Sequence, residues 1–346
     1  MFLCMNKKNS DTQVVLEAGQ LGFQMPMLEP FIFGAHHKDA YPAGNNRMGP
    51  AETRDGIEWG ADFDPKAPWR MYHGSMVPGF PSHPHRGFET VTIVVQGFID
   101  HSDSNGCTGR YGEGDVQWMT AGAGCQHAEM FPLIDPDGPN PLELFQLWLN
   151  LPAKDKMTKP DYRMFWNENV PVVTKDGGRT SVRVIAGRFD GVEALAPVPA
   201  SWAADPDHHV GIFLIDMDEG GSATLPAVDE SLGRAAYTYG TGTVSVAGEE
   251  LSGGSYAFLR GDREITIEAI EDGCRMLVLE AEPIGEPVAA YGPFVMNTRK
   301  ELEQAYEDYR RTGFGGWPWK SDDPVNSRSS GRFSVHSDGS KETPPA

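Results

Sequence analysis

Two short histidine-containing segments constrain the fold of this chain most. The first contains His83 and His85, and the second contains His127 and Glu129. Residues 90–95 between them are rich in β-branched side chains and predict a strand. Because residues two apart on a strand point to the same face, each of the two pairs shares a face. If the two segments form strands that face each other inside a barrel, all four side chains converge.

Three imidazoles and one carboxylate suit a borderline divalent ion such as iron, with coordination positions left open. Glu129 is the preferred carboxylate ligand, because its spacing from His127 repeats the spacing of the first histidine pair. Glu89 is the second choice, because it shares strand parity with His83 and His85. Together with Asp115 and Gln117 it is also a candidate hydrogen-bond acceptor for the outer ring nitrogens of the histidines. The alternative interpretation is that the histidines occupy solvated turns.

Weaker signals for metal binding come from four other histidines: His36, His37, His73 and His101. Cys125 precedes His127 by two residues, so it is either a residue of the metal site or a small buried thiol.

Composition favours a soluble chain of many short strands. The 346 residues are enough for two domains, and 40 glycines and 27 prolines favour turns over a helical bundle. A net charge of −20 argues against direct nucleic-acid binding. The four scattered cysteines indicate a reducing compartment. Residues 1–12 read as a mobile leader, and neither a signal peptide nor a membrane span is evident, so we expect a cytoplasmic protein.

Three separated segments resemble the signature of the pirin family of bicupins. They are FPSHPHRGFETVT at residues 80–92, GDVQWMTAGAG at 114–124 followed by HAEM at 127–130, and YGPFVMNT at 291–298. The resemblance covers roughly residues 20–312 and is thin between 172 and 285. It implies an all-β fold of two tandem cupin barrels, which are double-stranded β-helices of the jelly-roll type, with a short C-terminal helix.

The resemblance also implies a function. Pirin relatives are associated with quercetin 2,3-dioxygenase activity, and only their N-terminal cupin holds iron. For this chain it implies one divalent metal ion, with Fe(II) preferred to Mn, Ni, Co, Cu or Zn. It also implies a flavonol-like substrate with O2, and Glu129 as the catalytic proton acceptor. Pirin relatives also serve as iron-bearing partner proteins of transcription, so a protein partner without turnover is the alternative. A metal-dependent isomerase or hydrolase on the same scaffold is a third possibility.

Several apolar side chains near the histidines are candidates for the wall of an aromatic-binding pocket. They are Phe80, Phe88, Trp118, Met119, Met130 and Phe131. Ordinary core packing is the alternative for each of them.

The first predicted domain is the metal-binding cupin barrel at residues 13–172. It carries a long irregular insertion at 38–70, and structureless segments of this length are uncommon unless they are functional or disordered. We hypothesise that the insertion lies over the mouth of the barrel. A surface insertion without a role is the alternative.

The second predicted domain is a cupin barrel at residues 173–285. Its only histidines, His208 and His209, are adjacent and would point to opposite faces of a strand, so we expect this barrel to be metal-free. Its expected strands cover residues 181–187, 210–217, 235–239, 243–246, 255–259, 264–269 and 275–280.

A C-terminal segment with one helix is expected at residues 286–318. Thr298 and Glu301 have the spacing of a capping box, and Gly313 supplies a helix stop. Residues 319–346 are rich in serine, proline, glycine and charge, so we expect a disordered tail.

Overall fold

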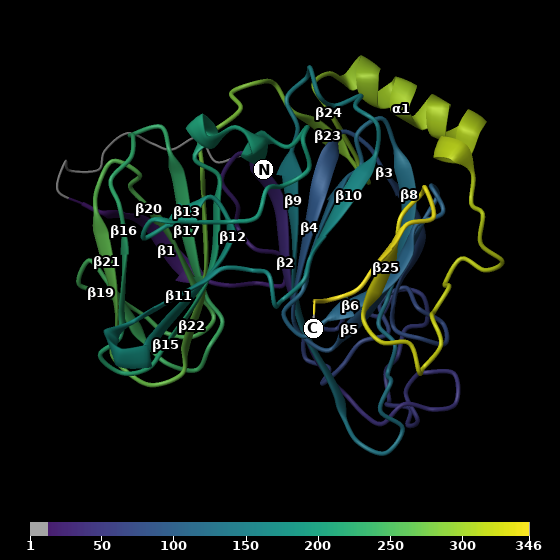
Figure 1. The fold of residues 1–346 in the computed structure, drawn as a ribbon, viewed down its shortest axis with the longest axis horizontal. Coiled ribbons are helices and arrows are strands. Elements are labelled where there is room, and N and C mark those ends of the chain that lie inside the picture. Colours follow the sequence, from purple (N-terminus) through teal and green to yellow (C-terminus); the bar gives the residue numbers. More distant parts are fainter. Residues whose placement is uncertain (1–12, 346) are drawn as a thin grey trace.

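The computed structural model describes residues 13–345, so the predicted leader at 1–12 lies outside the described residues. Two β-barrels lie side by side, and one helix packs at the edge of the first barrel (Figure 1). This confirms the predicted all-β fold with two barrels and a short C-terminal helix. No helix in the described part of the chain is long and apolar enough to cross a membrane.

The first barrel consists of two sheets. The five-stranded sheet contains, in spatial order, β10 (Asp161–Phe165), β7 (Val116–Thr120), β4 (Phe88–Gln96), β9 (Asn140–Asn150) and β2 (Phe31–Tyr41). The six-stranded sheet contains β26 (Lys341–Glu342), β25 (Phe333–Val335), β6 (Thr108–Gly112), β5 (Phe98–Asp103), β8 (Cys125–Met130) and β3 (Gly79–His85). Both predicted histidine segments therefore lie in the six-stranded sheet.

The second barrel has a similar two-sheet plan. Its seven-stranded sheet contains β1 (Val15–Gln20), β20 (Ser255–Leu259), β17 (Gly233–Thr238), β22 (Cys274–Ala281), β15 (Gly211–Met217), β12 (Thr180–Ala186) and β11 (Val172–Lys175). Its four-stranded sheet contains β16 (Ser222–Leu225), β21 (Ile265–Ala269), β18 (Val244–Val246) and β19 (Glu249–Leu251). Each of the seven strands expected between residues 181 and 280 is present.

The remaining elements are short. They are the hairpins β13 (Arg188–Phe189) with β14 (Val192–Glu193) and β23 (Ala289–Tyr291) with β24 (Phe294–Met296), the helix α1 (Arg299–Thr312), and the 3-10 turns η1 (Asp176–Gly178), η2 (Trp202–Ala204), η3 (Pro206–His208) and η4 (Gly313–Gly315).

The two barrels share one hydrophobic core. Val91 and Ile93 on the outer face of β4 pack in the same cluster as Ile212 and Leu279 of the second barrel. The inner face of β4 looks into the first barrel, where Val94 joins a separate core. Strand β4 is thus covered on both faces, and its residues 88–94 are all buried, including Glu89 and the two threonines.

One strand departs from the predicted domain boundaries. Residues 13–172 were expected to form the first barrel alone, yet β1 pairs antiparallel with β20 of the second barrel. An apolar run indicates a strand, but it does not specify which sheet edge that strand extends. His208 also differs from expectation, because it lies in η3 and not on a strand, with its Nδ1 2.7 Å from the Trp202 carbonyl oxygen.

The helix α1 follows its sequence signals. Thr298 and Glu301 form the predicted capping box, and Gly313 ends the helix in the left-handed region at φ 54°. The buried side chains Leu302 and Ala305 pack with Phe294 of β24. The helix therefore covers the third of the three signature segments.

The expectation of a disordered tail is wrong for the described residues. Strand β25 pairs with β6, and Ser334 is buried against the first barrel. Arg110 of β6 is fully buried, pairs with Asp100 at 2.7 Å and donates to carbonyl oxygens of the tail, including those of Ser327 and Ser330 at 3.0 Å. The contacts of the tail with Arg110 and with β6 are made by its backbone, and a prediction from side-chain composition does not register backbone contacts.

Trypsin should therefore cut the folded tail slowly. The Arg328 side chain donates to the Ile134 carbonyl oxygen at 2.7 Å, and Arg332 pairs with Asp115 at 2.8 Å. We expect cleavage after these two arginines only when the chain is first unfolded by heat, as followed by mass spectrometry. Rapid release of residues 333–346 from the folded protein would contradict the docked tail.

Candidate metal centre and adjoining cavity

The two histidine segments meet as neighbouring strands of one sheet. Strands β3 and β8 pair antiparallel, with His83 directly opposite His127, after a bulge between Phe80 and His83. The sequence prediction placed the strands on facing walls, which is wrong, but the convergence of the side chains is the same. The ring centroids of His83 and His127 are 4.5 Å apart, and those of His85 and His127 are 5.0 Å apart.

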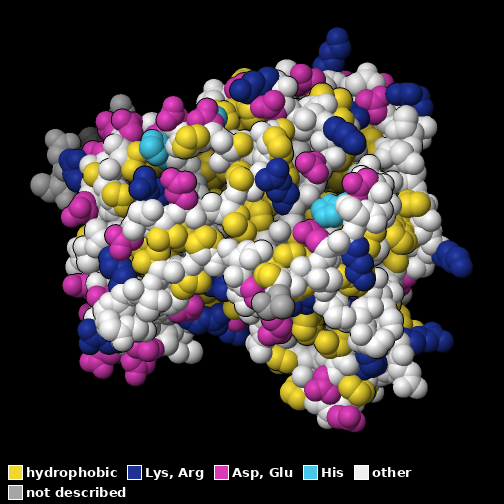
Figure 2. Space-filling view, viewed as in Figure 1, with side chains coloured by type: hydrophobic (Ala, Val, Ile, Leu, Met, Phe, Trp, Pro, Cys, Tyr) yellow, Lys and Arg dark blue, Asp and Glu magenta, His cyan; other side chains and the backbone are white. Residues whose placement is uncertain are grey.

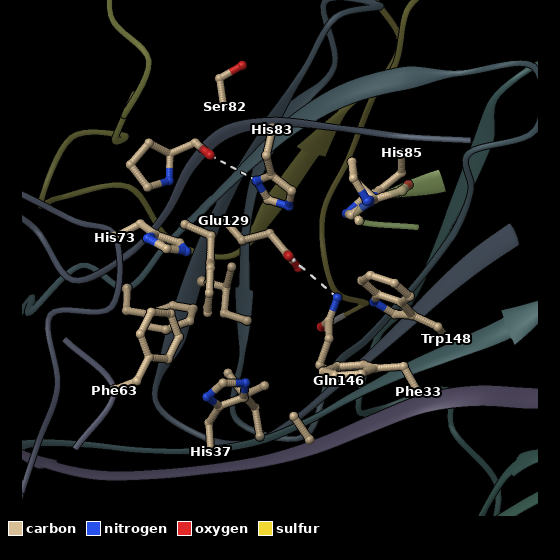
Figure 3. Close-up of a pocket in the computed structure, with 18 of the residues that line it drawn as sticks. Phe33, His37, Phe63, His73, Ser82, His83, His85, Glu129, Gln146 and Trp148 are labelled. Atoms are coloured by element: carbon tan, nitrogen blue, oxygen red, sulfur yellow. Dashed lines mark hydrogen bonds between the residues drawn. The ribbon is translucent and has the colours of Figure 1, made fainter. Parts of the chain in front are cut away.

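These three imidazoles have the spacing of a metal site. One ring nitrogen from each histidine lies within 4.8 Å of the others. Glu129 lies beside them, with its Oε2 3.7 Å from Nε2 of His127. Two side chains hold the glutamate. The Thr92 hydroxyl is 3.2 Å from its Oε1, and the Gln146 amide nitrogen is 3.4 Å from its Oε2 (Figure 3).

The hydrogen bonds of the rings fit a metal at this point. Nδ1 of His83 faces the Pro81 carbonyl oxygen at 2.8 Å, and Nδ1 of His85 faces the Pro293 carbonyl oxygen at 3.4 Å, which leaves Nε2 of each ring free to coordinate. His127 is fully buried, and neither ring nitrogen has a hydrogen-bond partner within the described residues. Leaving such atoms unpaired is costly, and a bound cation would satisfy one of them.

Burial sets the protonation of this group. It lowers the pKa of His83 to about 4 and the pKa values of His85 and His127 well below the ordinary range, so all three rings are neutral near pH 7. Burial also raises the pKa of Glu129 to about 7, against the opposing effects of His101, Thr92 and Gln146. Neutral imidazoles are the form that binds metal, whereas the glutamate still exchanges a proton at neutral pH.

A cavity of about 620 Å³ opens next to the cluster. Its lining is mostly aromatic and aliphatic, with Glu129, Gln146, Ser82 and histidine rings as the polar groups (Figure 3). The apolar members are Phe23, Phe33, Ala35, Phe63, Phe80, Pro81, Ile99, Phe131, Leu144, Trp148 and Pro293. This size and composition suit a small, largely apolar ligand.

The predicted pocket residues divide into two groups. Phe80 and Phe131 line the cavity. Phe88 instead stacks on Trp148, with ring centroids 4.4 Å apart, and Met119 and Met130 are buried side chains outside the lining. Trp118 belongs to the core between the barrels. For these four residues the alternative of core packing is the one that the structure supports.

The residues predicted to accept hydrogen bonds from the histidine rings lie elsewhere. Glu89 accepts hydrogen bonds from Thr120 at 2.7 Å and Ser201 at 2.5 Å, on the side of β4 that faces the second barrel. Its strand parity with His85 does not hold, because the chain changes sheets between β3 and β4 at Gly87, where φ is +86°. Burial raises the pKa of Glu89 to about 7.

The other two candidates also lie away from the histidine rings. Asp115 accepts from the backbone N–H groups of Gly112 at 2.9 Å and Asn167 at 2.8 Å. Gln117 lies opposite Thr92 across β4 and β7, buried and outside the cavity lining. Proline carbonyls take the role that these side chains were expected to play.

Sequence reasoning missed three functional contacts. Gln146 and Trp148 reach the cavity from β9, and Pro293 reaches His85 from residues 291–298. The signal for the first two was the alternation of Leu144, Gln146 and Trp148, which places a polar group on an apolar strand face. The signal for Pro293 was its place in the third signature segment.

Two parts of the irregular segment after β2 reach the cavity. Phe63 and His73 are lining residues, whereas Trp59 of the same segment is 60% exposed. Arg54 pairs with Asp62 and holds this segment closed on itself. The role of a lid stays a prediction.

The fold and the site together define a protein of two cupin barrels with a histidine cluster in the first barrel only among the described residues. The pirin family matches residues 13–149, and the pirin C-terminal cupin domain matches residues 212–315. The chain therefore belongs to the pirin family.

Relatives and a solved structure agree with this assignment. A pirin-like protein of Caulobacter vibrioides is 41% identical over 237 residues, which are 68% of this chain and 80% of the relative. Pirin-1 of Arabidopsis thaliana is 39% identical over 247 residues, which are 70% of this chain and 80% of the relative. A crystal structure of quercetin 2,3-dioxygenase from Acinetobacter baumannii has a TM-score of 0.70 and 30% identity, and covers 88% of this chain and 98% of that chain.

Metal affinity is expected to depend on pH through Glu129. A proton competes with the metal for this carboxylate below about pH 7, so affinity should rise as pH increases through that value. Titration with Co(II) between about pH 5.5 and 8.5 should show a gain approaching roughly tenfold per pH unit on the acidic side.

The control is Glu129→Gln, which cannot titrate at this position. Its Co(II) affinity should be lower and nearly independent of pH above about 6, because the histidine pKa values lie below that range. An equal pH slope in the wild type and the glutamine variant would exclude Glu129 as a ligand.

Proposed function

We propose that this chain is a mononuclear non-haem iron oxygenase of the quercetin 2,3-dioxygenase type, acting on a flavonol or a similar aromatic enol with O2. One observation carries the proposal: three neutral imidazoles and a carboxylate meet at the wall of an apolar cavity of about 620 Å³. The resemblance to a solved structure named as quercetin 2,3-dioxygenase, at 30% identity, supports it.

The proposed metal ligands are His83, His85, His127 and Glu129. One divalent ion is assigned to the chain, Fe(II) before Mn, Ni, Co, Cu or Zn, because an imidazole and carboxylate donor set suits all of these. The bound ion supplies a Lewis acid that lowers the pKa of a substrate hydroxyl, and iron adds redox chemistry toward O2.

Glu129 is the proposed proton acceptor. It is a buried carboxylate beside His127 in the cavity lining, so it is placed to take a proton from a substrate hydroxyl and to release it later. Hydrogen bonds from Thr92 and Gln146 hold the carboxylate in its orientation while its charge changes.

The cavity walls provide binding and exclude water. Phe33 and Trp148 pack together with ring centroids 4.8 Å apart on one side. Phe80 lies on the side of His83, at a centroid distance of 6.3 Å. A flat aromatic ligand between these rings would gain both burial and ring stacking. A cavity of this kind favours turnover of a small molecule over the alternative of a purely protein-binding role.

The oxygenase is tested with the flavonol absorbance band. After anaerobic loading with Fe(II), addition of quercetin and then air should bleach the band in the wild type and not in His127→Ala. Glu129→Gln should lower kcat by about 10² to 10⁴, as expected when a positioned base is lost. An unchanged band with every metal would favour the partner-protein alternative.

The role of the loop is tested at Phe63. Phe63→Ala should raise KM for quercetin by roughly 5- to 20-fold with little change in kcat, because it removes apolar contact area and no chemistry. Trp59→Ala is the matched control from the same loop, since this side chain is 60% exposed and outside the lining. An unchanged KM in the Phe63 variant would exclude a contribution of the loop to binding.

A further inference from the structure

One polar side chain of the cavity has no part in the metal cluster. His37 lies on β2 and lines the cavity at the end away from His83 and His85 (Figure 3). Its neighbours along the wall are aromatic, with Phe80 at 5.9 Å and Phe23 at 5.7 Å between ring centroids. A polar ring at the far end of an apolar cavity is a candidate recognition group.

The hydrogen bonds behind His37 fix which nitrogen carries its proton. The Tyr72 hydroxyl donates its only proton to Oδ2 of Asp39 at 2.7 Å, and Arg70 donates to Oδ1 of Asp39 at 3.0 Å. The Tyr72 oxygen can therefore only accept from Nδ1 of His37, which is 2.8 Å away. The ring has Nδ1–H on the buried side and a lone pair on Nε2.

The ring is also held neutral. Burial lowers the pKa of His37 to about 3, with further lowering from His36 and Arg70. No hydrogen-bond partner of its Nε2 is found among residues 13–345. His37 therefore offers the cavity an acceptor that does not change between acidic and neutral pH.

We propose that His37 is a specificity residue that accepts a hydrogen bond from a second hydroxyl of the aromatic ligand, at the end distal to the metal cluster. The inference rests on the proposed function for the ligand class. It adds that the ligand is a polyphenol with a hydrogen-bond donor at each end. The hydrogen bonds from Arg70 and Tyr72 to Asp39 make Nε2 of His37 the acceptor of this subsite.

The test compares two ligands that differ only in the hydroxyls other than the 3-hydroxyl. Quercetin carries phenolic hydroxyls besides its 3-hydroxyl, whereas 3-hydroxyflavone has the 3-hydroxyl alone. Binding of each to the full chain is measured by calorimetry under nitrogen, so no turnover is needed. The variants are His37→Asn, whose amide can keep the bond to Tyr72 but leaves nothing at Nε2, and His37→Gln, whose amide oxygen can replace Nε2.

The expected result is selective. His37→Asn should weaken quercetin binding by roughly 3- to 10-fold and leave 3-hydroxyflavone unchanged, and His37→Gln should restore part of the loss. The control is His36→Phe, one residue earlier on the opposite face, where the ring stacks on Phe145 and contacts Glu143. This variant should leave both affinities unchanged.

Several outcomes would overturn the proposal. Equal weakening of both ligands in His37→Asn would mean a structural role, and unchanged quercetin affinity would mean no role. Failure of the wild type to bind either ligand would exclude this ligand class. The proposed oxygenase is separable, because bleaching in air can fail while the selective loss persists, or persist while the selectivity is absent.

Discussion

The pairing of β3 with β8 is the constraint on which the site depends. Its register sets His83 opposite His127, and the bulge before His83 turns the preceding segment toward the cavity. A slip of one residue would turn the imidazoles to the other face of the sheet. Burial of the apolar side chains between these strands favours the register. A bound metal ion would favour it further, because it would pair with a nitrogen of His127 that has no hydrogen-bond partner among the described residues.

The signature segments, far apart in the sequence, form one unit around this register. The Pro293 carbonyl faces His85, and the Val295 N–H donates to the Arg86 carbonyl at 3.0 Å. Arg86 in turn donates to Asp308 of α1 at 2.9 Å. The helix and β24 thus support the strand that carries two of the imidazoles. Lys and Arg side chains are intermixed with Asp and Glu on the face drawn in Figure 2.

Local sequence signals predicted most of the fold. The capping box at Thr298, the parity of His83 with His85, and the short strands of the second barrel depend on neighbours in the chain, and each is present. The partner of β1, the docking of the tail on Arg110 and the Pro293 carbonyl behind His85 depend on long-range contacts. The error at Glu89 has the same origin, because parity fails where a strand changes sheets.

Elemental analysis of protein purified without chelators tests directly whether the histidine cluster and Glu129 hold a metal ion. We expect about one divalent metal atom per chain in the wild type, held by the three histidines of the cluster and by Glu129. We expect none in a His83→Ala/His85→Ala double variant that retains its fold by circular dichroism. Metal retained by the double variant, or a wild type that takes up no metal under any loading condition, would exclude a metal centre at these residues.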